Sequence, residues 1–151
     1  MDRSYRLPRI ALREQPLFAM LAQFPAVAFT LALVTDIAFW QTSNILWQNF
    51  SSWLLFAGLV VGGLAAFAAV ISLLFSSRFR FERGNWLYAA AGALVLALAF
   101  LNSLVHAADG WTAVVPYGLI LSAATVLVML VAAWIGHRTV ARHGFGAQSY
   151  E

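Results

Sequence analysis

The segment RFRFER, Arg78 to Arg83, lies between two long apolar runs, residues 53–75 (WLLFAGLVVGGLAAFAAVISLLF) and residues 87–106 (LYAAAGALVLALAFLNSLVH). A hydrocarbon core of about 30 Å takes roughly 20 helical residues to cross, and each run reaches that length. Two further runs, residues 18–40 and 114–136, do so as well. The sequence therefore predicts an all-α integral membrane protein, a bundle of four transmembrane helices over these four ranges.

The composition agrees with a membrane protein. Of the 151 residues 62% are apolar and 10% are charged, and the mean hydropathy is +0.80. Soluble domains carry about 25% charged residues. We expect one transmembrane domain, residues 18–136, between a basic cytoplasmic segment, residues 1–17, and a cytoplasmic tail, residues 137–151. The basic segment fits either a short helix in the membrane interface or a disordered tail.

The basic residues define an orientation. All nine are arginines, and they precede the first run, separate the second from the third, or follow the fourth. Because cytoplasmic loops retain Lys and Arg, both termini are predicted to lie inside, in a bacterial inner membrane. Arginines at helix ends favour anionic lipid head groups over nucleic acid as their partner. They are Arg3, Arg6, Arg9, Arg13, Arg78, Arg80, Arg83, Arg138 and Arg142.

Small residues recur one helical turn apart in the second run. Gly58 and Gly62 form a GxxxG pattern that continues to Ala66. In lipid, such a face allows two helices to approach closely. The pattern predicts a packing surface, which could meet another helix of the same chain or a helix of a partner.

Polar side chains inside the apolar runs are few. Asp36 lies one turn before Trp40, and Asn102 lies one turn before His106. If the first and third helices are neighbours, Asp36 could accept a hydrogen bond from His106 or Asn102 and form an outward-facing polar pocket for protons or a quinone head group. The structural alternative is an interhelical hydrogen bond that fixes the packing of the helices.

The connection after the first run has no charged residue. An apolar loop at a membrane surface is expected to dock on a partner or to return to the interface. We therefore predict a protein partner, or a homo-oligomer, and a docking surface on this loop. Its apolar residues are Ile45, Leu46, Trp47 and Phe50.

No pattern of residues predicts catalysis or a bound metal. The chain has no cysteine, and it lacks HExxH, Walker and dinucleotide-binding motifs. His106 falls near the outer end of the third run, whereas His137 and His143 fall at the inner end of the fourth, so two histidines of one chain cannot clamp a haem. The sequence predicts a non-catalytic protein with no metal and no cofactor.

Two stretches and the topology between them resemble a known family. The first runs from Gln15-Pro16-Leu17 through Gln23-Phe24-Pro25 to Asp36, and the second is residues 136–146, GHRTVARHGFG. Together they resemble the bacterial predicted membrane proteins grouped as domain of unknown function 2231, which have four helices, an early HP...HFP pattern and a closing RHG.G pattern. The resemblance covers roughly residues 15–146 and implies the same fold.

This chain departs from that pattern at its histidines. Gln15 and Gln23 stand where the family pattern has histidines, so a haem or metal proposal based on the family loses its ligands here. Two functions remain. The first is a structural or accessory subunit of a larger inner-membrane assembly, possibly respiratory or quinone-linked. The alternative is a small transporter, channel or quinone/proton-handling protein that uses Asp36, Asn102 and His106.

Overall fold

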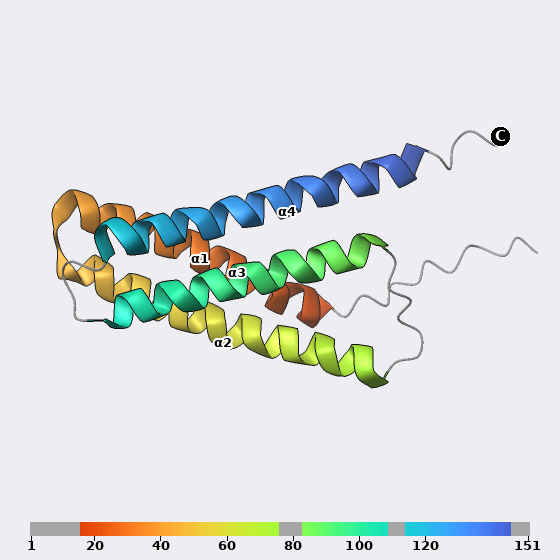
Figure 1. The fold of residues 1–151 in the computed structure, drawn as a ribbon, viewed down its shortest axis with the longest axis horizontal. Coiled ribbons are helices and arrows are strands. Elements are labelled where there is room, and N and C mark those ends of the chain that lie inside the picture. The colour runs from red at the N-terminus through yellow and green to blue at the C-terminus, as the bar shows by residue number, and fades with distance from the viewer. Residues whose placement is uncertain (1–15, 76–82, 109–113, 146–151) are drawn as a thin grey trace, which may run out of the picture.

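The computed structural model describes residues 16–75, 83–108 and 114–145. These residues form four helices: α1 (Pro16–Thr42), α2 (Ile45–Phe75), α3 (Arg83–Ala107) and α4 (Leu119–Phe145). A short π-helical segment, η2 (Val114–Gly118), leads into α4 (Figure 1). No strand occurs in the described ranges. The predicted all-helical class is confirmed, and the segments 1–15, 76–82, 109–113 and 146–151 lie outside the described residues.

The turn between α1 and α2 is shorter than the sequence analysis predicted. Ser43 adopts a positive φ of 53°, and its N–H donates to the carbonyl of Phe39 at 2.7 Å. Asn44 then caps α2, because its side-chain oxygen accepts the N–H of Leu46 at 3.0 Å. The helix therefore begins at Ile45, eight residues before the predicted start. The expected loop 41–50 is a two-residue turn followed by the first turns of α2.

The start of the last helix is irregular. Val115 has non-helical angles, φ −117° and ψ 120°, and it precedes Pro116, whose ring disfavours the helical conformation in the residue before it. The regular helix α4 consequently begins at Leu119. The predicted fourth run began at Val114, so its first turn is this irregular segment.

The helices pack in chain order, each on the next, and α4 closes on α1. The core at the centre contains Phe29 and Ala32 of α1, Leu55 of α2, and Val95 and Ala99 of α3. Among the candidate spans, the one in α1 has the lowest mean hydropathy, 1.4, and the largest buried share, 39%. The least apolar of the four spans is thus the one that the other helices cover most.

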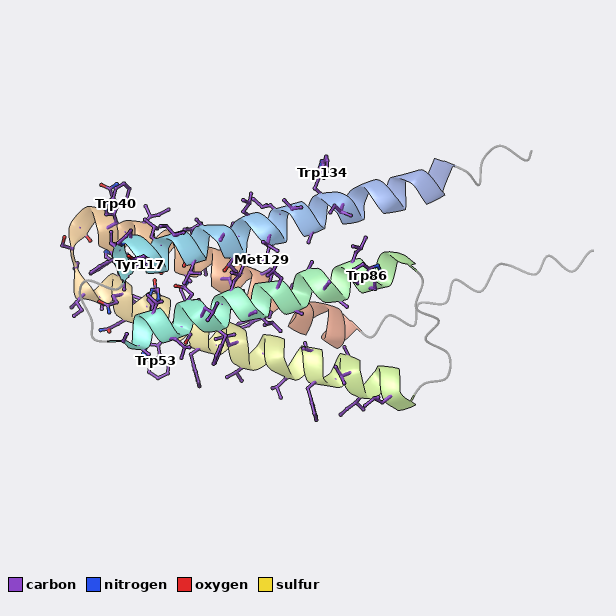
Figure 2. All side chains as sticks on the ribbon, viewed as in Figure 1. Trp40, Trp53, Trp86, Tyr117, Met129 and Trp134 are labelled. Atoms are coloured by element: carbon purple, nitrogen blue, oxygen red, sulfur yellow. The ribbon has the colours of Figure 1, made fainter. Side chains whose placement is uncertain are left out.

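The outer surface is apolar. Each of the four helices is long and apolar enough to cross a membrane, and large apolar side chains are exposed along all of them. The exposed tryptophans and tyrosine labelled in Figure 2 lie toward the two ends of the bundle: Trp40, Trp53 and Tyr117 near the α1–α2 turn, and Trp86 and Trp134 toward the opposite end. Aromatic rings prefer the head-group level, so this pattern is that of a bilayer-spanning bundle.

The helices spread apart away from the α1–α2 turn (Figure 1). The spreading explains where the small-residue face of α2 ends. Gly58 and Gly62 are buried, whereas Ala66, one turn further, is exposed. Within this chain the packing surface therefore ends at Gly62, and a contact of Ala66 with a partner stays a prediction.

Candidate functional site

A cluster of buried polar side chains lies in the half of the bundle next to the α1–α2 turn. Every helix contributes two members, and each member is less than 9% exposed. Buried polar groups in a bilayer are costly unless they bond to one another. The eight residues, which we call the polar cluster, are Thr35, Asp36, Gln48, Ser51, Asn102, His106, Ser122 and Thr125.

Asp36 is the centre of the polar cluster. Its side chain is fully buried, and hydrogen bonds reach it from the three other helices. The hydroxyl of Ser51 donates to Oδ1 at 2.5 Å, and the hydroxyl of Ser122 donates to Oδ2 at 2.5 Å. Nε2 of His106 lies 2.9 Å from Oδ1. Both carboxylate oxygens are thus bonded, which compensates in part for the loss of water around the carboxylate.

His106 reaches Asp36 across the bundle, from the third helix to the first. Its Nδ1 lies 3.0 Å from the backbone carbonyl of Asn102, one turn back on α3. A carbonyl oxygen can only accept, so Nδ1 carries a proton and donates it. The ring is therefore held at both nitrogens, with Nδ1 on the carbonyl of Asn102 and Nε2 on the carboxylate of Asp36.

The contact between His106 and Asp36 contains one proton. Two lone pairs cannot form a hydrogen bond, so the 2.9 Å contact requires a proton on either Nε2 or Oδ1. In the first case the pair is imidazolium and carboxylate, and in the second it is neutral imidazole and carboxylic acid. Both arrangements have zero net charge. Loss of that proton would leave one uncompensated negative charge in the bundle.

Two further contacts extend the bonds around Asp36. The amide of Asn102 donates to the hydroxyl of Ser122 at 2.7 Å, so Ser122 accepts from one side and donates to Asp36 on the other. The hydroxyls of Thr35 and Ser51 lie 2.6 Å apart. Either hydroxyl can be the donor in that contact, and the hydroxyl of Thr35 also reaches the carbonyls of Leu31 and Ala32, at 3.0 and 2.9 Å. The chain from Asn102 through Ser122 runs toward the carboxylate.

Two buried oxygen atoms have no hydrogen-bond partner among the described residues. They are Oδ1 of Asn102 and Oε1 of Gln48. An unpartnered buried acceptor typically costs about 1–3 kcal/mol. Both residues belong to the polar cluster, so two of its oxygen atoms could each accept a further hydrogen bond.

The start of α4 covers the histidine. A Cβ atom added at Gly118 would lie 2.9 Å from Cε1 of His106 and 3.5 Å from Oδ1 of Asn102. Only a residue without a side chain allows the backbone to lie this close to the ring. Gly118 and the fully buried Val114 thus place η2 against the polar cluster.

The sequence analysis identified three residues that the structure brings together: Asp36, Asn102 and His106. These side chains are 0%, 0% and 6% exposed, so they are buried between the helices, and the outward-facing pocket stays a prediction. The sequence analysis missed Ser51 and Ser122, which donate directly to Asp36. Serine is common in membrane helices, and only its alignment with Asp36 in space distinguishes these two.

The other predicted surfaces have separate positions. Gly58 lies against Phe29 of α1, where an added Cβ would be 2.5 Å from the ring, and Gly62 lies against Leu96 of α3. The small-residue face therefore meets helices of the same chain. Of the predicted docking residues, Ile45, Leu46 and Phe50 are exposed at the start of α2, and Trp47 is half-buried.

No metal-binding arrangement appears within the ranges that the structure describes, since no three His, Cys, Asp or Glu side chains meet there. Both ring nitrogens of His106 are engaged in hydrogen bonds, so binding an iron or zinc ion would require one of these bonds to break. The side chains of His137 and His143 lie outside the described part.

The fold and the polar cluster define a small α-helical membrane protein with a buried carboxylate–imidazole pair. The chain belongs to the family described as predicted membrane protein (DUF2231), whose model matches residues 14–149. The family resemblance seen in the sequence is thereby confirmed. Comparison with curated proteins and with solved structures gives no match.

Proposed function

We propose that this membrane protein handles protons, and that the pair Asp36–His106 takes up and releases one proton at one end of the bundle. The observation that supports the proposal is the pairing of two ionisable side chains, which are held 2.9 Å apart on non-adjacent helices with almost no exposure. The other side chains bonded to the pair, from α2 and α4, are uncharged hydroxyls. The charge of this site therefore depends on that proton alone.

The main alternative is a purely structural polar cluster. Ser, Thr and Asn side chains suffice to join membrane helices by hydrogen bonds. An aspartate and a histidine add the desolvation of two ionisable groups, and such groups within membrane helices usually mark proton or ion pathways. The presence of the ionisable pair is what favours a proton-handling function over a structural clamp.

The depth of the site suits exchange with water. Asp36 lies six residues before the end of α1 at Thr42, or about 9 Å along a helix that rises 1.5 Å per residue. Trp40 and Trp53 mark the aromatic belt at the same end (Figure 2). We further propose that this end faces outward from a bacterial inner membrane and that both termini are cytoplasmic, because the arginines flank the opposite helix ends.

Infrared spectroscopy of the protein in lipid tests the proposal directly. The other acids and histidines of the chain contribute bands to the difference spectrum between acidic and alkaline pH in every variant. The wild type should show in addition the loss of the shared proton, as an imidazole or a carboxyl band, and Asp36→Asn should change this contribution while the helix content stays constant. Thr30→Val is the matched control on α1, since the hydroxyl of Thr30 is exposed and bonds only to the carbonyl of Ala26. Identical spectra for the wild type and Asp36→Asn would refute the proposal.

A second experiment separates transport from proton binding alone. The protein is placed in liposomes that enclose a pH-sensitive dye, with valinomycin and potassium to compensate charge. Transport predicts faster pH equilibration than in empty liposomes and loss of this gain in Asp36→Asn, with a homo-oligomer forming the path because four helices are few for one. If Asp36→Asn fails to fold in either experiment, the structural alternative is favoured.

A role as accessory subunit of a larger assembly is the second candidate. It is favoured by the length of α2, whose 31 residues extend about 46 Å and exceed a hydrocarbon core of about 30 Å. The exposed Ile45, Leu46 and Phe50 occupy its first turns. Under this proposal Ile45→Glu releases a co-purifying partner in mild detergent, whereas Asn49→Glu, at an exposed polar position of the same turn, retains it.

A further inference from the structure

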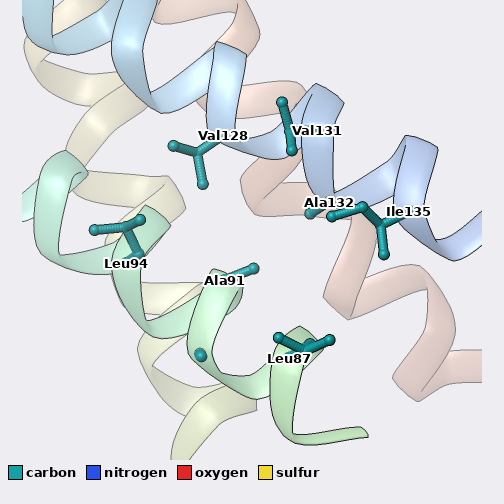
Figure 3. A pocket seen from close by; sticks show the side chains of 8 residues that line it. Leu87, Ala91, Leu94, Val128, Val131, Ala132 and Ile135 are labelled. Atoms are coloured by element: carbon teal, nitrogen blue, oxygen red, sulfur yellow. The ribbon is translucent and has the colours of Figure 1, made fainter. Parts of the chain in front are cut away.

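An apolar groove separates α3 from α4 in the half of the bundle away from the polar cluster (Figure 3). Its volume is about 260 Å³. The side chains from the two helices face one another across it without filling the space. The lining residues include Leu87, Ala91 and Leu94 of α3 and Val128, Val131 and Ile135 of α4.

The groove opens toward the lipid. Leu87, Leu94, Val131 and Ile135 are exposed although they line it. It follows the region in which the two helices spread apart (Figure 1). A groove of this kind within a membrane span is filled by apolar material from the bilayer or from another protein, because water has no polar partner there.

The end of the groove lies at the level of the head groups. Trp86 precedes the lining residue Leu87 on α3, and Trp134 precedes the lining residue Ile135 on α4. Both tryptophans are exposed and occur toward the same end of the bundle (Figure 2). Exposed tryptophans are typical of the membrane–water interface. An occupant of the groove can therefore extend from the hydrocarbon to the head-group region.

Positive charge follows directly beyond this end. Arg83 is the first residue of α3, one turn before Leu87, and Arg138 lies one turn after Ile135 on α4. Basic residues near a membrane surface attract anionic lipid. The apolar groove and the arginines beyond it thus match the acyl chain and the charged head group of an anionic lipid.

We propose that the groove binds one acyl chain of an anionic phospholipid, whose phosphate lies at the level of Arg83, at the start of α3, and Arg138, one turn beyond the groove on α4. A helix of a partner or of a second copy is about 10–12 Å across with its side chains. The volume of 260 Å³ lies below the roughly 300–1,000 Å³ of pockets for compact ligands. A single flexible hydrocarbon chain suits this narrow space better than a helix does.

Native mass spectrometry of the full chain, released from nanodiscs of equal parts phosphatidylglycerol and phosphatidylcholine, tests the proposal. The wild type should retain phosphatidylglycerol at least several-fold over phosphatidylcholine. Ala91→Leu, which fills the groove, should reduce the retained lipid several-fold. Ala97→Leu is the matched control, because Ala97 is exposed on the same helix and does not line the groove.

A second variant tests the head-group part without altering the groove. Arg83→Gln combined with Arg138→Gln should abolish the preference for phosphatidylglycerol while lipid is still retained. Equal retention of both lipids by the wild type, or equal retention by Ala91→Leu and Ala97→Leu, would overturn the proposal. So would a wild-type dimer that Ala91→Leu converts to a monomer, since the groove would then hold a second copy.

Discussion

Gly118→Ala is the substitution that tests the geometry of the polar cluster most directly. The added Cβ would lie 2.9 Å from Cε1 of His106 and 3.4 Å from its Nδ1. The φ angle of Gly118 is outside the left-handed region, so the backbone itself accepts alanine. The contact with the ring is therefore the main obstacle to the substitution.

The expected loss of stability follows from how the ring is held. His106 is bonded at both nitrogens, to the carbonyl of Asn102 and to Asp36, so it cannot turn away from a new methyl group without losing a bond. Overpacking of this kind costs about 1–3 kcal/mol. If the ring leaves Asp36, loss of a hydrogen bond to a charged group adds about 1.5–3 kcal/mol. We expect a destabilisation within the range of about 1–6 kcal/mol that these terms span.

Reversible unfolding by SDS in mixed micelles, followed by circular dichroism, measures this loss. The matched control is Gly92→Ala, because nothing lies within 4 Å of a Cβ added at Gly92. That control should be neutral or stabilising by about 0.5–1 kcal/mol, since alanine favours a helix over glycine. The pH-dependent imidazole bands in the infrared spectrum should also change in Gly118→Ala and not in Gly92→Ala.

A double-mutant cycle decides whether the ring is the cause. In a His106→Ala background the methyl group at position 118 has no ring to meet, so the cost of Gly118→Ala should fall by at least about 1 kcal/mol. An unchanged cost in that background would refute the reasoning. So would a wild-type-like stability of Gly118→Ala itself.

Two further predictions concern packing and hydrogen bonding. Gly58→Ala should destabilise the bundle by about 1–3 kcal/mol in the same SDS titration, because the added Cβ would lie 2.5 Å from the buried ring of Phe29. Gly63→Ala is the control and should not destabilise it, because the space around Gly63 is open. Equal stability of the two variants would contradict the packing of α2 on α1. Ser122→Ala should cost about 1–3 kcal/mol, because it removes a partner from both Asn102 and Asp36. Thr125→Val is its control, since that hydroxyl bonds only within α4, and an equal loss in both variants would argue against the bridge.

The membrane fold could be predicted from the sequence, and the helix bounds only in part. Four long apolar runs leave few alternatives to four helices. The early start of α2 was missed because residues 45–52 include polar side chains, although Asn44 is a capping residue that signals a helix start. Pro116 likewise signalled an irregular start for the fourth helix.

The candidate site was predictable at its charged members and not at its hydroxyls. Asp36 and His106 are rare residue types within apolar runs, so their positions alone indicate a site. Whether they touch depends on the crossing of non-adjacent helices, which the pattern of one sequence does not give. Ser51 and Ser122 become informative only when the distances to Asp36 are known. The groove between α3 and α4 could not be predicted from the sequence either, because it depends on how far the two helices spread apart.

The directions of the hydrogen bonds link the proton of Asp36–His106 to the start of α4. Ser51 and Ser122 both donate to the carboxylate, so they remain favourable partners when the pair loses its proton. His106 would lose one of its two contacts, because the single proton left on the neutral ring can serve either the carbonyl of Asn102 or the carboxylate of Asp36. The ring has little room to withdraw, since the backbone of Gly118 lies against it. A movement of His106 upon the proposed proton release would therefore require η2 to move with it.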